Sequence, residues 1–194
     1  MTSTRREEPF VPDRPAYWNP LPAARQIVST WDDPERALSG KWEQRNWRNV
    51  PGPFYGADTD TCATGPLVAP RRVLCDENGM EFVYRQPQDP AALAEVLDAV
   101  WQDPFGGYAC DGDDHWTCAD VRGWWSERGR VREWAQSLAI TYSTSNNEFD
   151  RAAVEHLRDF ADYLDGDLRD YLRGYLFWLS EGREPHPDEA LPLL

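Results

Sequence analysis

The strongest constraint on the fold is a tight-turn sequence between two short apolar segments within residues 71–85. Asn78-Gly79 accepts the positive φ angles of a type I′ turn, which joins the two strands of a β-hairpin. Because a hairpin alone is only marginally stable in water, the pattern also predicts either a third strand over residues 64–69 or a helical cover. Apolar and polar residues alternate along both arms, with Val73, Cys75, Phe82 and Tyr84 at apolar positions.

Most of the remaining chain has helical periodicity. Asp89-Pro90 places a capping residue before a proline and predicts a helix that ends near Gln102. Thr117 predicts the cap of another helix, which we expect to break at Gly129 and to continue to residue 140. Shorter helices are predicted over residues 23–31 and 34–40.

The C-terminal part of the chain predicts a helical hairpin. Apolar residues recur at helical spacing over residues 149–164 and again over residues 168–179. Gly166-Asp167 marks the turn between them, with Asp167 as the predicted N-cap. We therefore predict an α+β fold, a helix-dominated single domain with a small antiparallel β-hairpin or sheet at about 71–85.

Proline sets both ends of the chain apart from its centre. Residues 1–22 contain five prolines and are predicted to form an extended arm. Residues 23–180 are predicted to form the compact domain, and residues 181–194, which are acidic and rich in proline, a flexible tail. If the arm docks on a neighbouring subunit, the protein is part of a larger assembly.

The net charge of −14 limits the classes of partner. A face that binds nucleic-acid phosphates has to be positive, so we expect no direct contact with nucleic acid. No apolar run approaches the ~20 residues of a membrane-spanning helix. The polar N-terminal residues lack the apolar stretch of a secretory signal. These observations predict a cytoplasmic protein that does not contact a membrane.

The negative charge is concentrated in the second half of the chain. Residues 1–97 carry 14 acidic and 11 basic side chains, a net of −3, whereas residues 98–194 carry 20 and 9, a net of −11. Residues 86–121 include eight acidic side chains, no basic one, and several aromatic residues. Such a segment is either a solvated acidic face with its aromatics turned inward, or a surface that binds a basic protein. The predicted partner-binding residues are Asp103, Phe105, Tyr108, Asp111, Asp113, Asp114, His115, Trp116 and Asp120.

The four cysteines are predicted to be reduced, mostly buried thiols, because nothing else in the chain indicates an oxidising compartment. The alternatives are one or two disulfides among Cys62, Cys75, Cys110 and Cys118, or a zinc site. The zinc site would use Cys110, His115, Cys118 and one distant cysteine, a spacing that matches no common zinc pattern. The loop that begins at Asp111 lacks the glycine and glutamate of a calcium-binding EF-hand. We therefore expect no metal and no other cofactor.

A catalytic alternative uses His115, a nearby aspartate and Cys118 as the nucleophile. No glycine-rich oxyanion loop flanks Cys118, and the chain has neither a dinucleotide fingerprint nor a phosphate loop. The aromatic and acidic loop of residues 52–60 is either a binding loop or part of the core. The ten tryptophans invite a carbohydrate-binding interpretation, but we expect at least seven of them to build the core.

These patterns favour a non-enzymatic, acidic interaction protein that binds and neutralises or regulates a basic protein. An immunity protein of a toxin–immunity pair, or a similar inhibitor, has this size and acidity, and a nucleic-acid mimic is a special case. In this hypothesis acidic residues within 103–120 meet cations of the partner while Trp116 or Phe105 fills a pocket. The alternative is a small-molecule or metal-dependent enzyme that uses the loop with His115 and Cys118.

Overall fold

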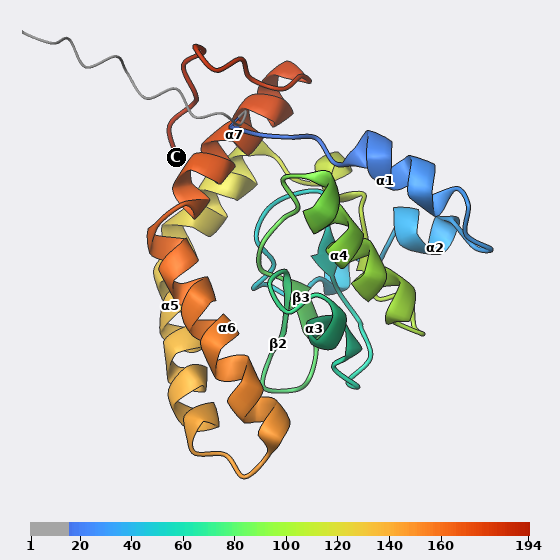
Figure 1. The fold of residues 1–194 in the computed structure, drawn as a ribbon. Helices are drawn as coiled ribbons and strands as arrows, with labels where there is room; N and C mark the ends of the chain where they lie inside the picture. Colours follow the sequence, from blue (N-terminus) through green and yellow to red (C-terminus); the bar gives the residue numbers. More distant parts are fainter. Residues whose placement is uncertain (1–15) are drawn as a thin grey trace, which may run out of the picture.

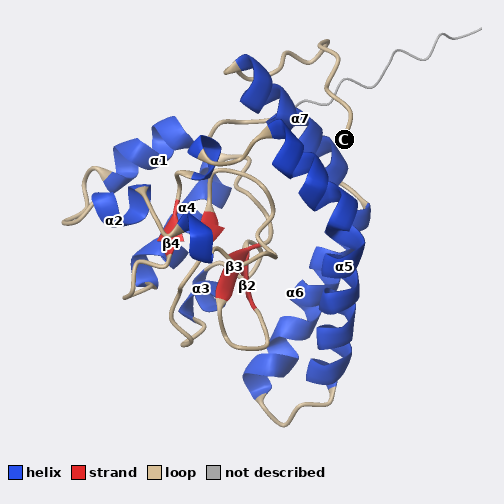
Figure 2. Ribbon diagram, turned by 180° about the vertical axis from the view of Figure 1, so that it is seen from behind, coloured by secondary structure: helices blue, strands red, loops and turns tan. Residues whose placement is uncertain are grey.

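A computed structural model describes residues 16–194, in which a β-hairpin lies between two groups of helices (Figure 1). Strands β2 (Val73–Cys75) and β3 (Glu81–Val83) pair in antiparallel fashion, with Val73 opposite Val83. Helices α1 (Leu21–Val28) and α4 (Pro90–Gln102) lie on one side of the hairpin, and the three C-terminal helices lie on the other (Figures 1 and 2). The predicted α+β, helix-dominated fold is confirmed.

The turn of the hairpin differs from the predicted type I′ turn. Only Gly79 has a positive φ, +81°, and its N–H donates to the Asp76 carbonyl at 2.9 Å. The Asp76 carboxylate accepts the backbone N–H groups of Asn78 and Met80 at 2.9 and 3.1 Å. The aspartate side chain therefore organises the turn, so Asn78 does not have to enter the left-handed region.

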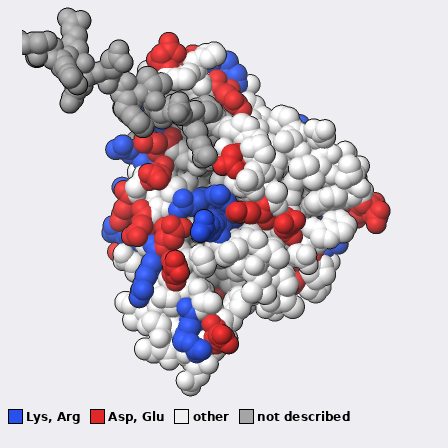
Figure 3. All heavy atoms as spheres, viewed as in Figure 1, with Lys and Arg blue, Asp and Glu red and all other residues white. Residues whose placement is uncertain are grey.

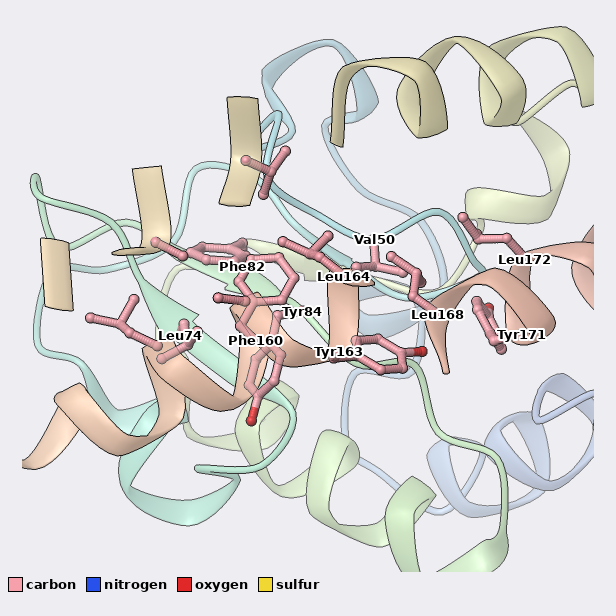
Figure 4. Packing of buried hydrophobic residues seen from close by; sticks show 14 of the residues in the cluster. Val50, Leu74, Phe82, Tyr84, Phe160, Tyr163, Leu164, Leu168, Tyr171 and Leu172 are labelled. Carbon is pink, nitrogen blue, oxygen red and sulfur yellow. The ribbon is translucent and has the colours of Figure 1, made fainter. Parts of the chain in front are cut away.

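The two faces of the hairpin belong to two different hydrophobic clusters. Val73 and Val83 pack with α1 and α4. Leu74, Phe82 and Tyr84 pack on the opposite side against the C-terminal helices, where Phe160 lies 5.2 Å from Tyr84 between ring centroids (Figure 4). The alternation of a β-strand thus distributes successive side chains between two cores.

A helix, rather than a third strand, covers the hairpin. Residues 64–69 contain helix α3 (Thr64–Val68), which packs against α4 and β2. Pro66 cannot donate to a strand ladder, and the Gly65 N–H donates to the Glu81 carboxylate at 3.0 Å instead. Of the two predicted alternatives, the helical cover is therefore correct.

A second small sheet joins distant parts of the chain. Strands β1 (Tyr55–Gly56) and β4 (Tyr108–Ala109) pair in antiparallel fashion. The buried Asn49 connects this sheet to the hairpin, because its Oδ1 accepts the N–H groups of Gly56 and Val83 at 2.9 and 2.8 Å. Phe54 and Tyr55 are also buried, so this part of the 52–60 loop belongs to the interior.

Helix α5 (Cys118–Ser143) is continuous, and the predicted break at Gly129 is wrong. Thr117 and Asp120 form a capping box at its start, as expected for a helix that Thr117 caps. Helix α6 (Glu148–Asp165) packs along α5 in antiparallel orientation (Figure 1). The packing of α6 along α5 offsets the cost of about 1 kcal/mol that a glycine such as Gly129 adds within a helix.

The predicted helical hairpin of residues 149–164 and 168–179 is wrong, because α6 and α7 (Leu168–Glu181) follow one another end to end and the antiparallel pair is α5 and α6 (Figure 1). Asp167 precedes α7 without a side-chain capping bond, so the predicted N-cap is wrong in that detail.

Helix α4 begins after Asp89, whose carboxylate accepts the Ala92 N–H at 2.8 Å, and it ends at the predicted residue. The remaining short helical segments are α2 (Glu35–Leu38), η1 (Trp42–Gln44) and η2 (Gly112–Asp114).

The predicted boundary between arm and domain at residue 22 falls inside α1. Tyr17 is already buried, and its ring stacks on Trp178 of α7 at 5.7 Å. Residues 1–15 of the predicted arm, with Phe10 and Val11, lie outside the described residues. At the other end, Arg173 donates to the Pro192 carbonyl at 2.9 Å, and Leu194 packs against the core. The flexibility of this tail stays a prediction.

Eight of the ten tryptophans pack against a hydrophobic cluster, as expected, and Trp47 and Trp101 are exposed. The four cysteines form no disulfide, and only Cys62 is exposed. Within residues 16–194, no helix is both long enough and apolar enough to cross a lipid bilayer.

Candidate interaction surface

The structure divides the nine predicted partner-binding residues between the interior and the surface. The prediction that Asp103, Tyr108 and Trp116 lie on an exposed protein-binding surface is wrong, because all three are buried. Asp111 and Asp113 are partly buried. The exposed members are Phe105, Asp114, His115 and Asp120.

Asp103 organises the loop that follows α4. It is 1% exposed, and its carboxylate accepts the backbone N–H groups of Phe105 at 3.2 Å, of Asp60 at 3.3 Å and of Gly107. A buried carboxylate requires several such donors, and here they come from both ends of the loop and from a distant segment. Asp103 therefore fixes the conformation of residues 103–107 and has no access to a partner.

Tyr108 belongs to a buried polar pair. Its hydroxyl donates to the Glu81 carboxylate on β3, which also accepts the Gly65 N–H. Burial raises the pKa of Glu81 to about 7, although the two hydrogen bonds oppose this shift. Tyr108 and Glu81 together connect the two small sheets.

Asp113 braces the 112–114 turn against α7. Its two carboxylate oxygens accept the Tyr175 hydroxyl and the Trp178 Nε1–H, both at 2.8 Å. Burial raises the pKa of Asp113, and the two hydrogen bonds counteract that effect. This side chain therefore acts within the fold, whereas its neighbour Asp114 is exposed.

Replacing Asp113 by Asn is expected to lower the free energy of unfolding by about 1–3 kcal/mol. The amide nitrogen of the new side chain cannot accept a hydrogen bond, so one of the two donors on α7 loses its partner. Asp114→Asn, at the exposed neighbouring position, is expected to change stability by less than about 0.5 kcal/mol. Urea unfolding of both variants checks this difference, and equal stabilities would show that Asp113 is not a brace.

Of the residues of the catalytic alternative, the structure brings His115 and Asp111 together but not Cys118. The His115 ring stacks on Trp42 at 4.7 Å, and its Nε2 lies 3.4 Å from Asp111 Oδ2. The Cys118 Sγ instead faces the Leu176 carbonyl of α7 at 3.9 Å. Cys118 therefore has no hydrogen bond to a base, and among the described residues no cluster of His, Cys, Asp or Glu has the arrangement of a metal site.

Exposed aromatic side chains gather instead around the C-terminal end of α4. Phe105 is 72% exposed and Trp101 is 57% exposed. The Trp101 ring meets Trp31 edge to face, with 5.1 Å between the ring centroids. We call Trp31, Trp101 and Phe105 the aromatic edge. Sequence reasoning did not place Trp31 or Trp101 in a site.

A hollow of about 200 Å³ lies beside the two tryptophans of the aromatic edge, and Asp32 and Asp33 also line it. Arg36 also lines the hollow, and its guanidinium donates to the Asp103 carbonyl. The Arg36 side chain packs so closely on Gly106 that a Cβ there would lie 2.9 Å from Arg36 Cγ. Arg36 thus joins the hollow to the loop that carries Phe105.

The aromatic edge is apolar, with acidic residues around it. Charged side chains gather over α5, α6 and α7, whereas the side with α1 and α4 is mostly uncharged (Figure 3). The exposed charges beside the edge are mainly acidic: Asp32 and Asp33 lie at the hollow, and Asp98 precedes Trp101 by one helical turn. An apolar centre with a polar rim is the usual composition of a protein–protein interface.

Comparisons of the chain with protein-family models, curated proteins and solved structures gave no match in any of the three. The arrangement of the side chains is therefore the basis for the functional argument. Trp101 and Phe105 are exposed at the C-terminal end of α4 and on the loop after it, beside a hollow that is smaller than the ~300–1,000 Å³ of most small-molecule sites.

Proposed function

We propose that this protein is a non-enzymatic, cytoplasmic binding protein that engages a basic protein through the aromatic edge and occludes its functional surface. The observation that carries the proposal is the rigid presentation of Phe105, which is 72% exposed on a loop that the buried Asp103 carboxylate holds. A solvent-exposed aromatic ring on a preorganised loop loses little conformational entropy on binding, and such residues supply much of the affinity of interfaces.

The charge distribution supports a basic partner. The net charge is −14, and Asp32, Asp33 and Asp98 surround the apolar residues of the edge. Such a field steers a cationic protein towards the site and repels acidic competitors. Inhibitors and immunity proteins of basic enzymes are the functional class that we favour, with nucleic-acid mimicry as a special case.

Affinity capture from a lysate of the native host tests the proposal with four forms of the protein. These are the wild type, Phe105→Ala, Trp101→Ala and, as a matched control, Ile140→Ala, which removes a 71% exposed apolar side chain from α5. We expect a basic protein to be retained by the wild type and the control and to be lost from both aromatic variants. In titrations with the purified partner, each aromatic replacement should weaken binding by about 2 kcal/mol, roughly 30-fold.

Two results would contradict the proposal in different ways. Retention of a basic protein by all four forms would place the interface elsewhere on the acidic surface. If the wild type retains no basic protein at low salt, where electrostatic attraction is strongest, the proposed function itself fails.

A further inference from the structure

A separate groove of about 450 Å³ lies between residues 45–49 and the first turns of α5. Trp47, Trp116 and Trp124 line it. Ala119 and Gly123, one helical turn apart, also line the groove, and a Cβ built at Gly123 meets no atom within 4 Å. The space above Gly123 is therefore open, and the groove's volume falls within the ~300–1,000 Å³ of small-molecule sites.

Two arginines that line this groove have their guanidinium groups on indole rings. The Arg45 guanidinium is 3.9 Å from the ring centroid of Trp42 and 5.5 Å from that of Trp116. Arg130 lies 4.1 Å from the centroid of Trp47. Across the described residues neither arginine forms an ion pair, although acidic side chains outnumber basic ones in the chain. Arg45 donates one hydrogen bond, to the Trp42 carbonyl at 3.1 Å, and both arginines keep further donors for an anionic ligand.

Among the described residues, the acidic side chains that line the groove form no ion pair with Arg45 or Arg130. Asp120 is occupied in the capping box, where its Oδ2 accepts the Thr117 N–H at 3.2 Å and the Thr117 hydroxyl at 2.5 Å. Glu127 lines the groove one turn before Arg130 and is exposed to solvent. Indole rings and guanidinium donors are thus combined in one hollow.

We infer that this groove binds a small molecule that combines a planar aromatic ring with a carboxylate or phosphate group. The ring packs among the indole side chains, and the anionic group pairs with Arg45 and Arg130. The planar fork of a guanidinium matches the oxygens of both kinds of anion. This site is independent of the aromatic edge, so its ligand is a second function of the protein.

A matched pair of variants tests the groove without weakening α5. Gly123→Leu places a side chain in the open space, whereas Gly129→Leu makes the same change on the same helix outside the groove, also where a Cβ meets nothing. Leucine is a better helix former than glycine by up to about 1 kcal/mol, so neither change is expected to unfold the helix. Thermal unfolding verifies this point.

The probes test the aromatic ring and the anionic group of the ligand separately. Benzoate and AMP carry both features, benzyl alcohol and adenosine carry only the ring, and inorganic phosphate carries only the anion. Binding is followed by NMR through the indole N–H signals, where Trp47, Trp116 and Trp124 report the groove and Trp101 serves as the internal control. Benzoate and AMP distinguish a carboxylate ligand from a phosphate ligand.

We expect benzoate or AMP to shift the three groove signals saturably in the wild type and in Gly129→Leu. Gly123→Leu should abolish the shift, and Arg130→Met should weaken binding about 10-fold, the effect of roughly one charged hydrogen bond. Glu127→Gln should strengthen binding, because it removes a negative charge from the groove. The inference is overturned if neither benzoate nor AMP binds the wild type, or if Gly123→Leu binds them equally well. It is also overturned if adenosine or inorganic phosphate binds as tightly as AMP, or if Glu127→Gln weakens binding.

Discussion

Replacing Arg48 by Met is expected to lower the free energy of unfolding by about 3–5 kcal/mol, the usual effect of removing one partner of a buried ion pair. Arg48 is 5% exposed and bonds the Asp76 carboxylate at 3.1 Å and the Glu77 carboxylate at 2.9 Å. Its guanidinium also lies 4.5 Å from the ring centroid of Trp47 and 4.2 Å from that of Trp134. The methionine fills similar space but leaves the charge of the buried Asp76 without its cation.

Arg132→Met is the matched control for this prediction. Arg132 pairs with Asp165 at 2.9 Å, but both side chains are substantially exposed, at 39% and 54%. Exposed ion pairs contribute about 0–1 kcal/mol, so this variant should remain close to the wild type in urea unfolding. Equal losses in the two variants would refute the role of Arg48 as the link between the hairpin turn and α5.

Glu81→Gln is expected to remove most of the decrease in stability between pH 5 and pH 8. Burial raises the pKa of Glu81 from 4.5 to about 7. Between these values the folded protein retains a proton that the unfolded chain has released, so stability falls as pH rises through this window. The full effect at alkaline pH is about 3 kcal/mol, and it is absent below the unfolded pKa.

Urea unfolding at acidic and alkaline pH checks this result. At the alkaline value Glu81→Gln should be more stable than the wild type, because glutamine stays neutral and its Oε1 still accepts the Gly65 N–H. At the acidic value the two proteins should be similar. Glu133→Gln, at an exposed position of α5, is the control. An unchanged pH dependence in Glu81→Gln would show that folding does not raise the pKa of this carboxyl group.

The elements that sequence reasoning located correctly are those with local signals. The capping aspartate and proline before α4 and the capping box of α5 each determine a helix start within a few residues. Strands β1 and β4 have two residues each and pair although they lie far apart in the sequence, so no local pattern could identify them. The hairpin turn also depends on the Asp76 side chain, which reaches beyond the Asn-Gly pair itself.

The candidate site was less predictable, because burial of an aspartate depends on donors that lie far away in the sequence. Asp103 and Asp114 occupy the same loop-rich, acidic region, yet only Asp103 meets an N–H from Asp60. No local signal separates Trp101 from the buried stripe of α4, because consecutive residues of this helix, such as Val96 and Leu97, are both buried. Val100 is 7% exposed, whereas Trp101 is 57% exposed.

The position of the hairpin between two cores has a consequence for the order in which the chain can fold. α4 follows the hairpin closely in the sequence, so the residues that cover Val73 and Val83 are available soon after the hairpin itself. Leu74, Phe82 and Tyr84 have to wait for α5 and α6, which come later in the chain. A nascent chain that ends before α6 therefore carries an uncovered apolar strand face, the kind of surface on which partially folded proteins aggregate. The C-terminal helices thus complete the core and end this period of exposure during synthesis.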